Sequence, residues 1–222
     1  MKNLLIPFIL IFLFSCGQKP QKEETSSYNF AELQKELAEM AKVDQEVQMN
    51  ILQNMDVVPE EILAHKRDSV FKANGERCKE IFSSLGFPGI DRVGEKGAKN
   101  FWLLVQHCDY DPAFQKNVLE AMKGEVEQEN ASSEDYAYLY DRVRVNAGEK
   151  QWYGTQLTHA ENMWAIPKPL ADSLSVNPRR EAIGLESIEA YLNGYMEMHF
   201  EMNQAYYKSI GATEAFAYEL LE

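Results

Sequence analysis

The chain has 222 residues, of which 45% are hydrophobic, and this is enough for a packed core. The composition therefore excludes a wholly disordered chain. Lys and Arg number 22 against 35 Asp and Glu, which gives a formal net charge of −13. A nucleic-acid backbone would meet net repulsion from this charge, and no basic run offsets it, so we predict no nucleic-acid partner.

The N-terminus has the organisation of a signal peptide. Lys2 precedes an apolar run over residues 4–14, and Ser15-Cys16 follows directly. The run is shorter than the roughly 20 residues that a spanning helix needs. A small residue before a cysteine resembles the lipobox of bacterial lipoproteins, in which the cysteine is acylated and the preceding peptide is removed. We predict a signal peptide over residues 1–15 and membrane attachment through a lipidated Cys16; a plain secretory peptide is the alternative.

Residues 16–27 are polar and predict a flexible tether. Gly17 stands where Asp would mark retention at the inner membrane, so by resemblance to lipoprotein sorting we predict an outer-membrane location in a bacterial envelope. Lys22-Glu23-Glu24 resembles a short signal for export to the cell surface, although an ordinary linker has the same composition. The sequence leaves open whether the protein faces the periplasm or the exterior.

Most of the remaining chain has apolar residues at helical spacing. Asp44 interrupts the apolar stripe of the first such segment. Asp111-Pro112 is typical of a helix start. We predict helices over residues 28–55 and 59–85, a buried helix around residues 101–105, and helices that begin at Pro112 and near Ser132 or Ser133.

The pattern changes after residue 150. Residues 151–169 predict a short β-hairpin, and helical spacing returns at Asn177-Pro178, read as a cap pair, and continues to Gly211. The predicted fold is mainly α: a single helical domain over residues 28–222 with a short β-hairpin, in which the first helix is either packed or a mobile arm. Cys78 and Cys108 are either a disulfide or two separately buried thiols.

Several polar residues stand next to apolar or glycine-containing segments. They form the motifs Gln106-His107-x-Asp109, Tyr138-Leu139-x-Asp141-Arg142 and Gln151-x-Tyr153-Gly154-Thr155-Gln156, together with Gln115 and the pair Arg179-Arg180. In this order they resemble the pattern of an uncharacterised bacterial domain-of-unknown-function family over about residues 60–195. The resemblance implies no particular activity.

Three functions remain open from the residues themselves. In an enzyme, His107 would be the general acid or base, oriented by Asp109 or Asp141, and an arginine would hold an anionic substrate. In a binding module, the same region would form a pocket for a small molecule, glycan or peptide. The predicted ligand-binding residues are Gln106, Gln115, Arg142, Gln151, Tyr153, Thr155, Gln156, Arg179 and Arg180.

In the third, structural alternative these side chains lock helices together, with Asp141 and Arg142 as a buried ion pair. The first two functions require the motifs to converge on one cleft, and alternation along a strand would point residues 151, 153 and 155 to one face. Tyrosines at helical spacing, such as Tyr138, Tyr191 and Tyr195, favour buried rings over a sugar-binding surface. No metal-ligand spacing occurs around His107, Asp109, Asp111 or His159, so we predict no metal and no other cofactor.

Overall fold

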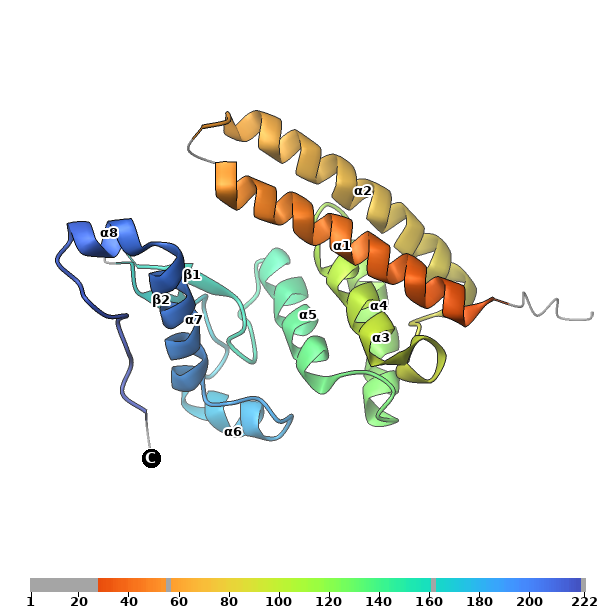
Figure 1. Cartoon of the computed structure of the whole chain (residues 1–222). Coiled ribbons are helices and arrows are strands. Elements are labelled where there is room, and N and C mark those ends of the chain that lie inside the picture. The colour runs from red at the N-terminus through yellow and green to blue at the C-terminus, as the bar shows by residue number, and fades with distance from the viewer. Residues whose placement is uncertain (1–27, 55–56, 161–162, 221–222) are drawn as a thin grey trace, which may run out of the picture.

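The computed structural model describes residues 28–54, 57–160 and 163–220, and its described part is mainly helical with one antiparallel hairpin (Figure 1). The predicted fold class is confirmed. The predicted signal peptide, the lipidation site Cys16 and the tether lie outside the described residues. None of the described helices is long and apolar enough to span a bilayer.

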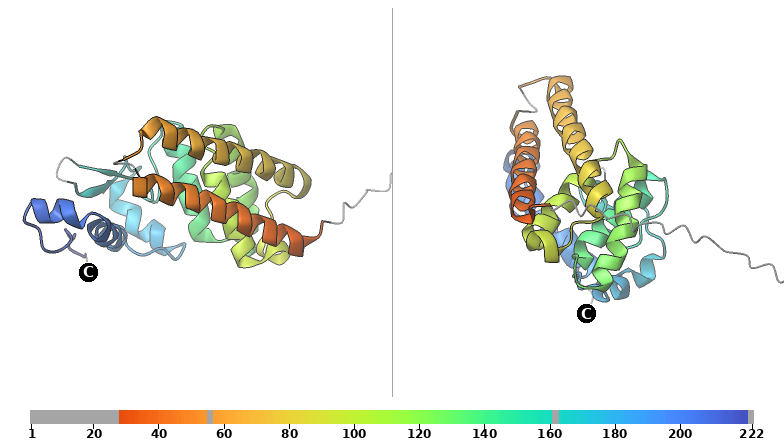
Figure 2. Two further views of the ribbon diagram at one scale, coloured as in Figure 1. Left: turned by 45° about the horizontal axis from the view of Figure 1, so that its top comes forward. Right: turned by 90° about the vertical axis from the view of Figure 1, so that its right-hand side faces the viewer.

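The first two helices form a long antiparallel hairpin. α1 (Phe30–Asn54) and α2 (Glu60–Leu85) run side by side along one side of the molecule (Figures 1 and 2). The apolar stripe of α1 packs on α3, and Leu33 and Leu37 are buried in the largest core cluster. α1 is therefore part of the packed body and not a mobile arm.

Local capping explains where the next helices begin. α3 (Ile90–Gln106) is the central helix, with a kink where Gly94 adopts a φ of +69°. α4 (Pro112–Glu127) starts after Asp111, whose side chain accepts a hydrogen bond from the Phe114 N–H at 3.1 Å. α5 (Ser133–Asn146) is capped by Ser132 in the same manner. These starts agree with the sequence pattern because a cap and its partner are three residues apart.

The helices α1 to α5 share one large hydrophobic core. Phe101 and Val105 of α3 are fully buried at its centre. Cys78 and Cys108 belong to the same cluster as free, buried thiols, so the disulfide does not form. Burial raises the pKa of the Cys108 thiol to about 11, which keeps it protonated and unreactive.

The C-terminal part has its own, smaller core. It consists of β1 (Leu157–His159), β2 (Ala165–Pro167), the short 3-10 helix η1 (Ser173–Ser175), α6 (Val176–Glu181), α7 (Ile188–Met202) and α8 (Gln204–Ser209). β1 pairs with β2, with Thr158 opposite Ile166. The helical stretch predicted from residue 177 is interrupted twice, and Asn177 does not cap α6. Its Oδ1 instead accepts the N–H of Ile188 at 2.8 Å, at the start of α7.

Candidate functional site

His107 stands directly after α3, and a buried carboxylate from α1 orients its ring. Its Nδ1 lies 2.8 and 3.0 Å from the two oxygens of Asp44, whose side chain is fully buried. A carboxylate only accepts hydrogen bonds, so Nδ1 carries a proton and Nε2 keeps its lone pair when the ring is neutral. The prediction that Asp109 or Asp141 orients His107 is therefore wrong.

The His107 ring is also fixed from its face. Phe71 of α2 stacks on it with ring centroids 4.4 Å apart and planes inclined by 15°. The His107 side chain remains 14% exposed, and its Nε2 has no hydrogen-bond partner among the described residues. One nitrogen of an immobilised ring is thus available to a ligand.

Asp109 forms a two-pronged ion pair with Arg142 of α5. Arg142 Nε and Nη2 donate to its carboxylate oxygens at 2.8 and 2.6 Å, and Gln115 and Asn146 donate to it as well. Burial by itself would raise the pKa of Asp109, but the Arg142 guanidinium and the two amides hold it below its ordinary value. Asp109 is thus an anion that positions Arg142. The buried Gln115 amide holds the Asp109 carboxylate in place.

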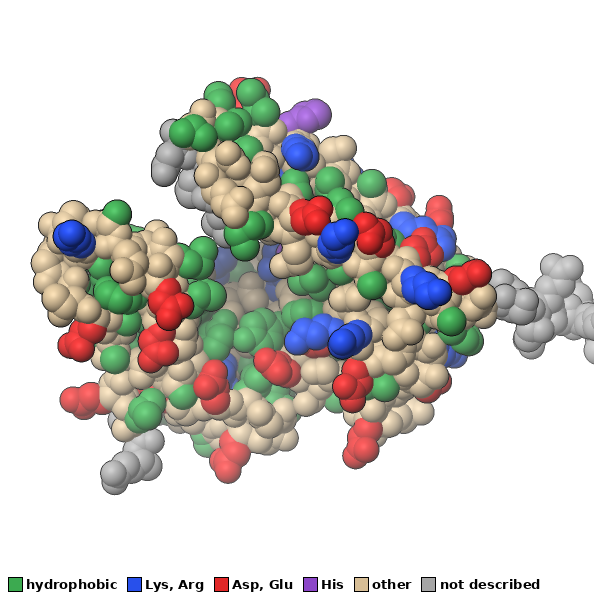
Figure 3. Space-filling view, in the orientation of Figure 1, with side chains coloured by type: hydrophobic (Ala, Val, Ile, Leu, Met, Phe, Trp, Pro, Cys, Tyr) green, Lys and Arg blue, Asp and Glu red, His purple; other side chains and the backbone are tan. Residues whose placement is uncertain are grey.

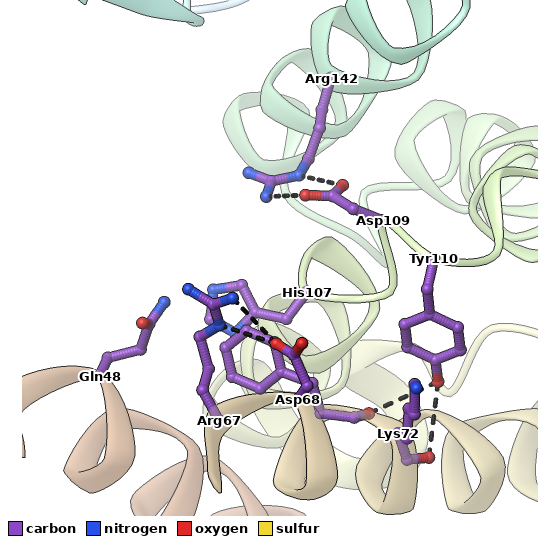
Figure 4. A pocket seen from close by; sticks show the side chains of 9 residues that line it. Gln48, Arg67, Asp68, Lys72, His107, Asp109, Tyr110 and Arg142 are labelled. Atoms are coloured by element: carbon purple, nitrogen blue, oxygen red, sulfur yellow. Dashed lines mark hydrogen bonds and ion pairs between the residues drawn. The ribbon is translucent and has the colours of Figure 1, made fainter. Parts of the chain in front are cut away.

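His107 and Arg142 line a cleft of about 520 Å³ between the α1–α2 hairpin and the end of α3 (Figure 4). The cleft carries three basic side chains, Arg67, Lys72 and Arg142, and two acidic ones. Arg67 pairs with the neighbouring Asp68 at 2.9 Å. Lys72 has no ion-pair or hydrogen-bond partner for its ammonium in the described chain. The lining residues are Gln48, Arg67, Asp68, Phe71, Lys72, His107, Asp109, Tyr110 and Arg142.

A second hollow of about 340 Å³ lies on the other side of His107 and Arg142, between α5 and α7. Figure 3 shows the molecule hollowed between these two parts, with hydrophobic side chains on the floor. His107 and Arg142 line both spaces and so stand where the two meet. The remaining lining residues are Leu103, Gln106, Tyr138, Thr155, Gln156, Leu157, Tyr191 and Tyr195.

Asp141 is not in either space, because a loop wraps around it. Its fully buried carboxylate accepts the backbone N–H groups of Trp152, Tyr153 and Thr155 at 2.7 to 3.2 Å and also the Thr155 hydroxyl. Residues 151–155 are therefore a loop closed around one anion, and the predicted strand-like alternation is wrong. Asp141 and Arg142 also do not pair with each other.

Three more predicted site residues support this loop. The amide of Gln151 donates to the carbonyls of Gln156 and Lys168 at 2.9 and 2.7 Å. Arg179 donates to the carbonyl of Trp152, and Arg180, which is 1% exposed, donates to that of Tyr153. Desolvation lowers the pKa of Arg180. Both guanidinium groups donate to backbone carbonyls, and neither arginine lines either of the two spaces.

The structure thus divides the predicted residues into two groups. Those lining the two joined spaces are Gln106, His107, Asp109, Arg142, Thr155 and Gln156. Those buried behind them or in the loop are Gln115, Asp141, Gln151, Tyr153, Arg179 and Arg180.

Sequence reasoning missed the contribution of the α1–α2 hairpin, namely Asp44, Gln48, Arg67, Phe71 and Lys72. The one signal for it was the interruption of the apolar stripe by Asp44, because a carboxylate on the buried face of a helix needs a partner. Within the described residues, no group of three or more His, Cys, Asp or Glu is arranged to hold a metal ion.

The fold and site define a mainly helical protein with a polar cleft beside His107 and a second hollow, between α5 and α7, that shares His107 and Arg142 with it. Residues 31–202 match the model of DUF6624, a family of unknown function, and the chain belongs to this family. The match starts within α1 and includes Asp44, whereas the motifs quoted from the sequence begin at Gln106. No curated protein and no solved structure matches the chain.

Proposed function

We propose that the protein is a lipid-anchored envelope protein whose helical domain binds a small anionic molecule in the cleft beside His107. The observation that carries the proposal is the unpaired ammonium of Lys72 in a cleft that also presents Arg67 and Arg142. The whole chain has a formal net charge of −13, whereas the lining of the cleft carries three basic and two acidic side chains, with Asp44 buried behind His107 as a third carboxylate.

The guanidinium group of Arg142 is already held in one orientation before such a ligand binds. Two of its nitrogens are held by Asp109, which fixes the plane of the guanidinium, while Nη1 has no partner among the described residues. A fixed guanidinium loses little freedom when it binds an anion, and carboxylate and phosphate groups match its geometry.

Titration with citrate and with inorganic phosphate, followed by calorimetry and by NMR, tests this binding. We expect saturable binding to the chain without residues 1–27, and about fivefold weaker binding by its Lys72→Gln variant, because one charge contact is worth about 1 kcal/mol near water. Lys66→Gln is the matched control, since it removes the same charge from an exposed position of α2 outside the cleft. Equal affinity for the two variants, or no binding of either anion, would refute the proposal.

A second candidate is acid–base catalysis, and the Asp44–His107 pair favours it. A buried carboxylate that fixes the proton on Nδ1 leaves Nε2 as a base facing the cleft region. Thr155 is the one hydroxyl of the Ser or Thr type in the described lining of the two spaces, and it donates to Asp141 instead of His107, so the pair at His107 supports proton transfer.

This candidate is tested by incubating the protein with envelope metabolite extracts and following substrate loss by mass spectrometry. His107→Gln should lower turnover by at least about 100-fold and leave citrate affinity unchanged. ¹⁵N NMR of the His107 ring should show the proton on Nδ1, and Asp44→Asn should shift it towards a mixture of tautomers. A variant without His107 that turns over at the wild-type rate rules out this role.

The anchoring part of the proposal is supported by Lys2, the apolar run over residues 4–14 and the Ser15-Cys16 pair. Two or three acyl chains on Cys16 would give stable membrane attachment. By resemblance to lipoprotein sorting, Gly17 favours an outer-membrane location. Mass spectrometry of the mature N-terminus should find an acylated Cys16, and Cys16→Ser should move the protein from the membrane fraction to the soluble fraction. A mature chain without fatty acid would end this part of the proposal.

A further inference from the structure

The second hollow contains an amide that the protein leaves without a partner. Gln106, in the last turn of α3, is 6% exposed, and its side-chain amide makes no hydrogen bond within the described residues. Its amide atoms are not among the fully buried unpaired side-chain atoms of the described residues, so the amide reaches the solvent of the hollow and is free to bind a ligand there. Gln106 lines the hollow, so a ligand entering it would meet one acceptor and two donors.

Gln156, in the loop before β1, contributes a second amide to the same hollow. Its Nε2 donates to the Thr155 hydroxyl at 3.3 Å, while its amide oxygen has no partner in the described chain. Its backbone is held rigidly by both ends of the Gln151 amide, at 2.8 and 2.9 Å. The amide oxygen is therefore a positioned acceptor.

Three tyrosines give the hollow an aromatic wall. Tyr138 and Tyr191 meet edge to face with ring centroids 6.1 Å apart, and the Tyr191 hydroxyl donates to the carbonyl of Thr155 at 3.0 Å. Tyr195 adds a third ring from α7. The helical spacing of these residues favoured buried rings, and the structure leaves all three only half-buried, beside the hollow.

The lining is neutral except where it meets the cleft. Arg142 is the one charged side chain in its described lining, and Arg142 and the imidazole of His107 are both shared with the first space. A ligand that fills both spaces would therefore place its charge near Arg142 and an uncharged part, able to form several hydrogen bonds, against the tyrosines. Phenyl rings pack against the C–H face of a pyranose ring while amides and hydroxyls bind its hydroxyl groups.

We propose that the second hollow binds the ring of an anionic sugar, a sugar unit that bears a carboxylate or a phosphate, with Gln106 as a specificity-determining residue. This rests on the proposed anion binding in the cleft, since the acidic substituent lies at the His107–Arg142 boundary. The volume of about 340 Å³ lies within the range of small-molecule sites, about 300 to 1,000 Å³.

The test compares the binding of five probes to the chain without residues 1–27 by calorimetry. The probes are glucuronate, glucose 6-phosphate, glucose, acetate and inorganic phosphate. We expect at least one sugar acid to bind about tenfold or more tightly than both glucose and its matching free anion. Comparing the affinities for glucuronate and acetate tests a sugar that carries a carboxylate. Comparing the affinities for glucose 6-phosphate and phosphate tests a sugar that carries a phosphate.

Gln106→Leu should abolish this tenfold advantage while leaving the affinity for the free anion unchanged. The variant replaces the amide with an apolar side chain of similar size, and because that amide makes no hydrogen bond within the described residues, its melting temperature should stay close to that of the wild type. The matched control is Gln128→Leu, at an exposed position after α4 that lines neither space.

Each result separates this inference from the proposed function. Binding of the free anions with no gain from the sugar overturns the inference alone, and so does a Gln106→Leu variant that keeps the full sugar preference. If neither citrate nor any of the anionic probes binds, the anion-binding cleft fails as well.

Discussion

The two cores of this molecule are held together in different ways. In the described chain, the core of α1 to α5 contains 18 buried apolar residues in one cluster, whereas the core of the hairpin, α6 and α7 contains five. The smaller part compensates with polar contacts: Asp141 gathers three backbone N–H groups, and Arg180 and Gln151 bind carbonyls. A region with little apolar area to bury depends on a few specific hydrogen bonds, and losing one of them removes a larger share of its stability than in the larger core.

The largest effect should come from Asp141→Ala. The substitution leaves three backbone N–H groups of the loop without their acceptor, and we expect the free energy of unfolding to fall by about 4 kcal/mol. Urea unfolding gives the magnitude. Hydrogen exchange should show that protection is lost first in the loop and hairpin, and equal loss throughout α1 to α5 would contradict the division into two differently stabilised parts.

The corresponding substitution in the larger core is Leu37→Ala. Leu37 of α1 is fully buried, and its truncation should cost about 3 kcal/mol through lost apolar contact and a residual cavity. The same urea experiment measures it. Amides of α1 and α3 should lose protection together, and an unchanged stability would mean that α1 is a loosely attached arm after all.

Two buried aspartates on α5 differ in how many hydrogen bonds their carboxylates accept. Asp141 is surrounded by donors, whereas Asp135, also buried, has no hydrogen bond to its carboxylate among the described residues. Desolvation raises the pKa of Asp135 to about 6 from an ordinary value of 3.8. The folded state therefore holds this proton more tightly than the unfolded state, and stability falls as the pH rises from about 4 to about 6.

Asp135→Asn should accordingly stabilise the protein by about 2 kcal/mol at pH 8 and change little at pH 4. Thermal and urea unfolding at the two pH values provide the measurement. Asp91→Asn, at an exposed position in the first turn of α3, is the control and should show no such pH-dependent gain. A stabilisation that is equal at both pH values would count against a buried, unpaired carboxylate.

The smallest effect concerns two histidines of the C-terminal part. His199 lies with its ring 5.0 Å from that of His159, and desolvation together with this neighbour lowers its pKa. The folded state therefore disfavours the protonated form, and stability should fall as the pH drops below about 6.5. His159→Ala should raise the pKa of His199 in an NMR titration and reduce this acid-induced fall, whereas His65→Ala, on the exposed face of α2, should do neither.

The helices of the larger core could be predicted from the sequence because their signals are local. Asp111 and Ser132 cap helices that start one residue later, and the apolar stripe of α1 repeats within a few turns. The first helix was expected over residues 28–55 and occupies Phe30–Asn54. Such patterns require only residues that are near in the chain.

The site could be predicted only in part because its decisive contacts are distant in sequence. His107 was recognised as a candidate, but Asp44 lies 63 residues before it. The Tyr-Gly-Thr-Gln motif was recognised, yet its shape depends on a carboxylate in α5 that no strand pattern indicates. Asn177 resembles a helix cap, but it caps no helix of its own: Ser187 caps α7, and Asn177 only accepts the N–H of Ile188 in its first turn.

The location of Asp44 has a practical consequence for where the chain can be shortened. The recognisable motifs begin after α2, and a fragment starting there would contain His107, Arg142 and the whole tyrosine wall. It would lack the carboxylate that holds the imidazole, the phenyl ring stacked on it and the helices that cover Phe101 and Val105. Such a truncated chain would keep every residue of the quoted motifs, but the His107 ring would no longer be held in its orientation.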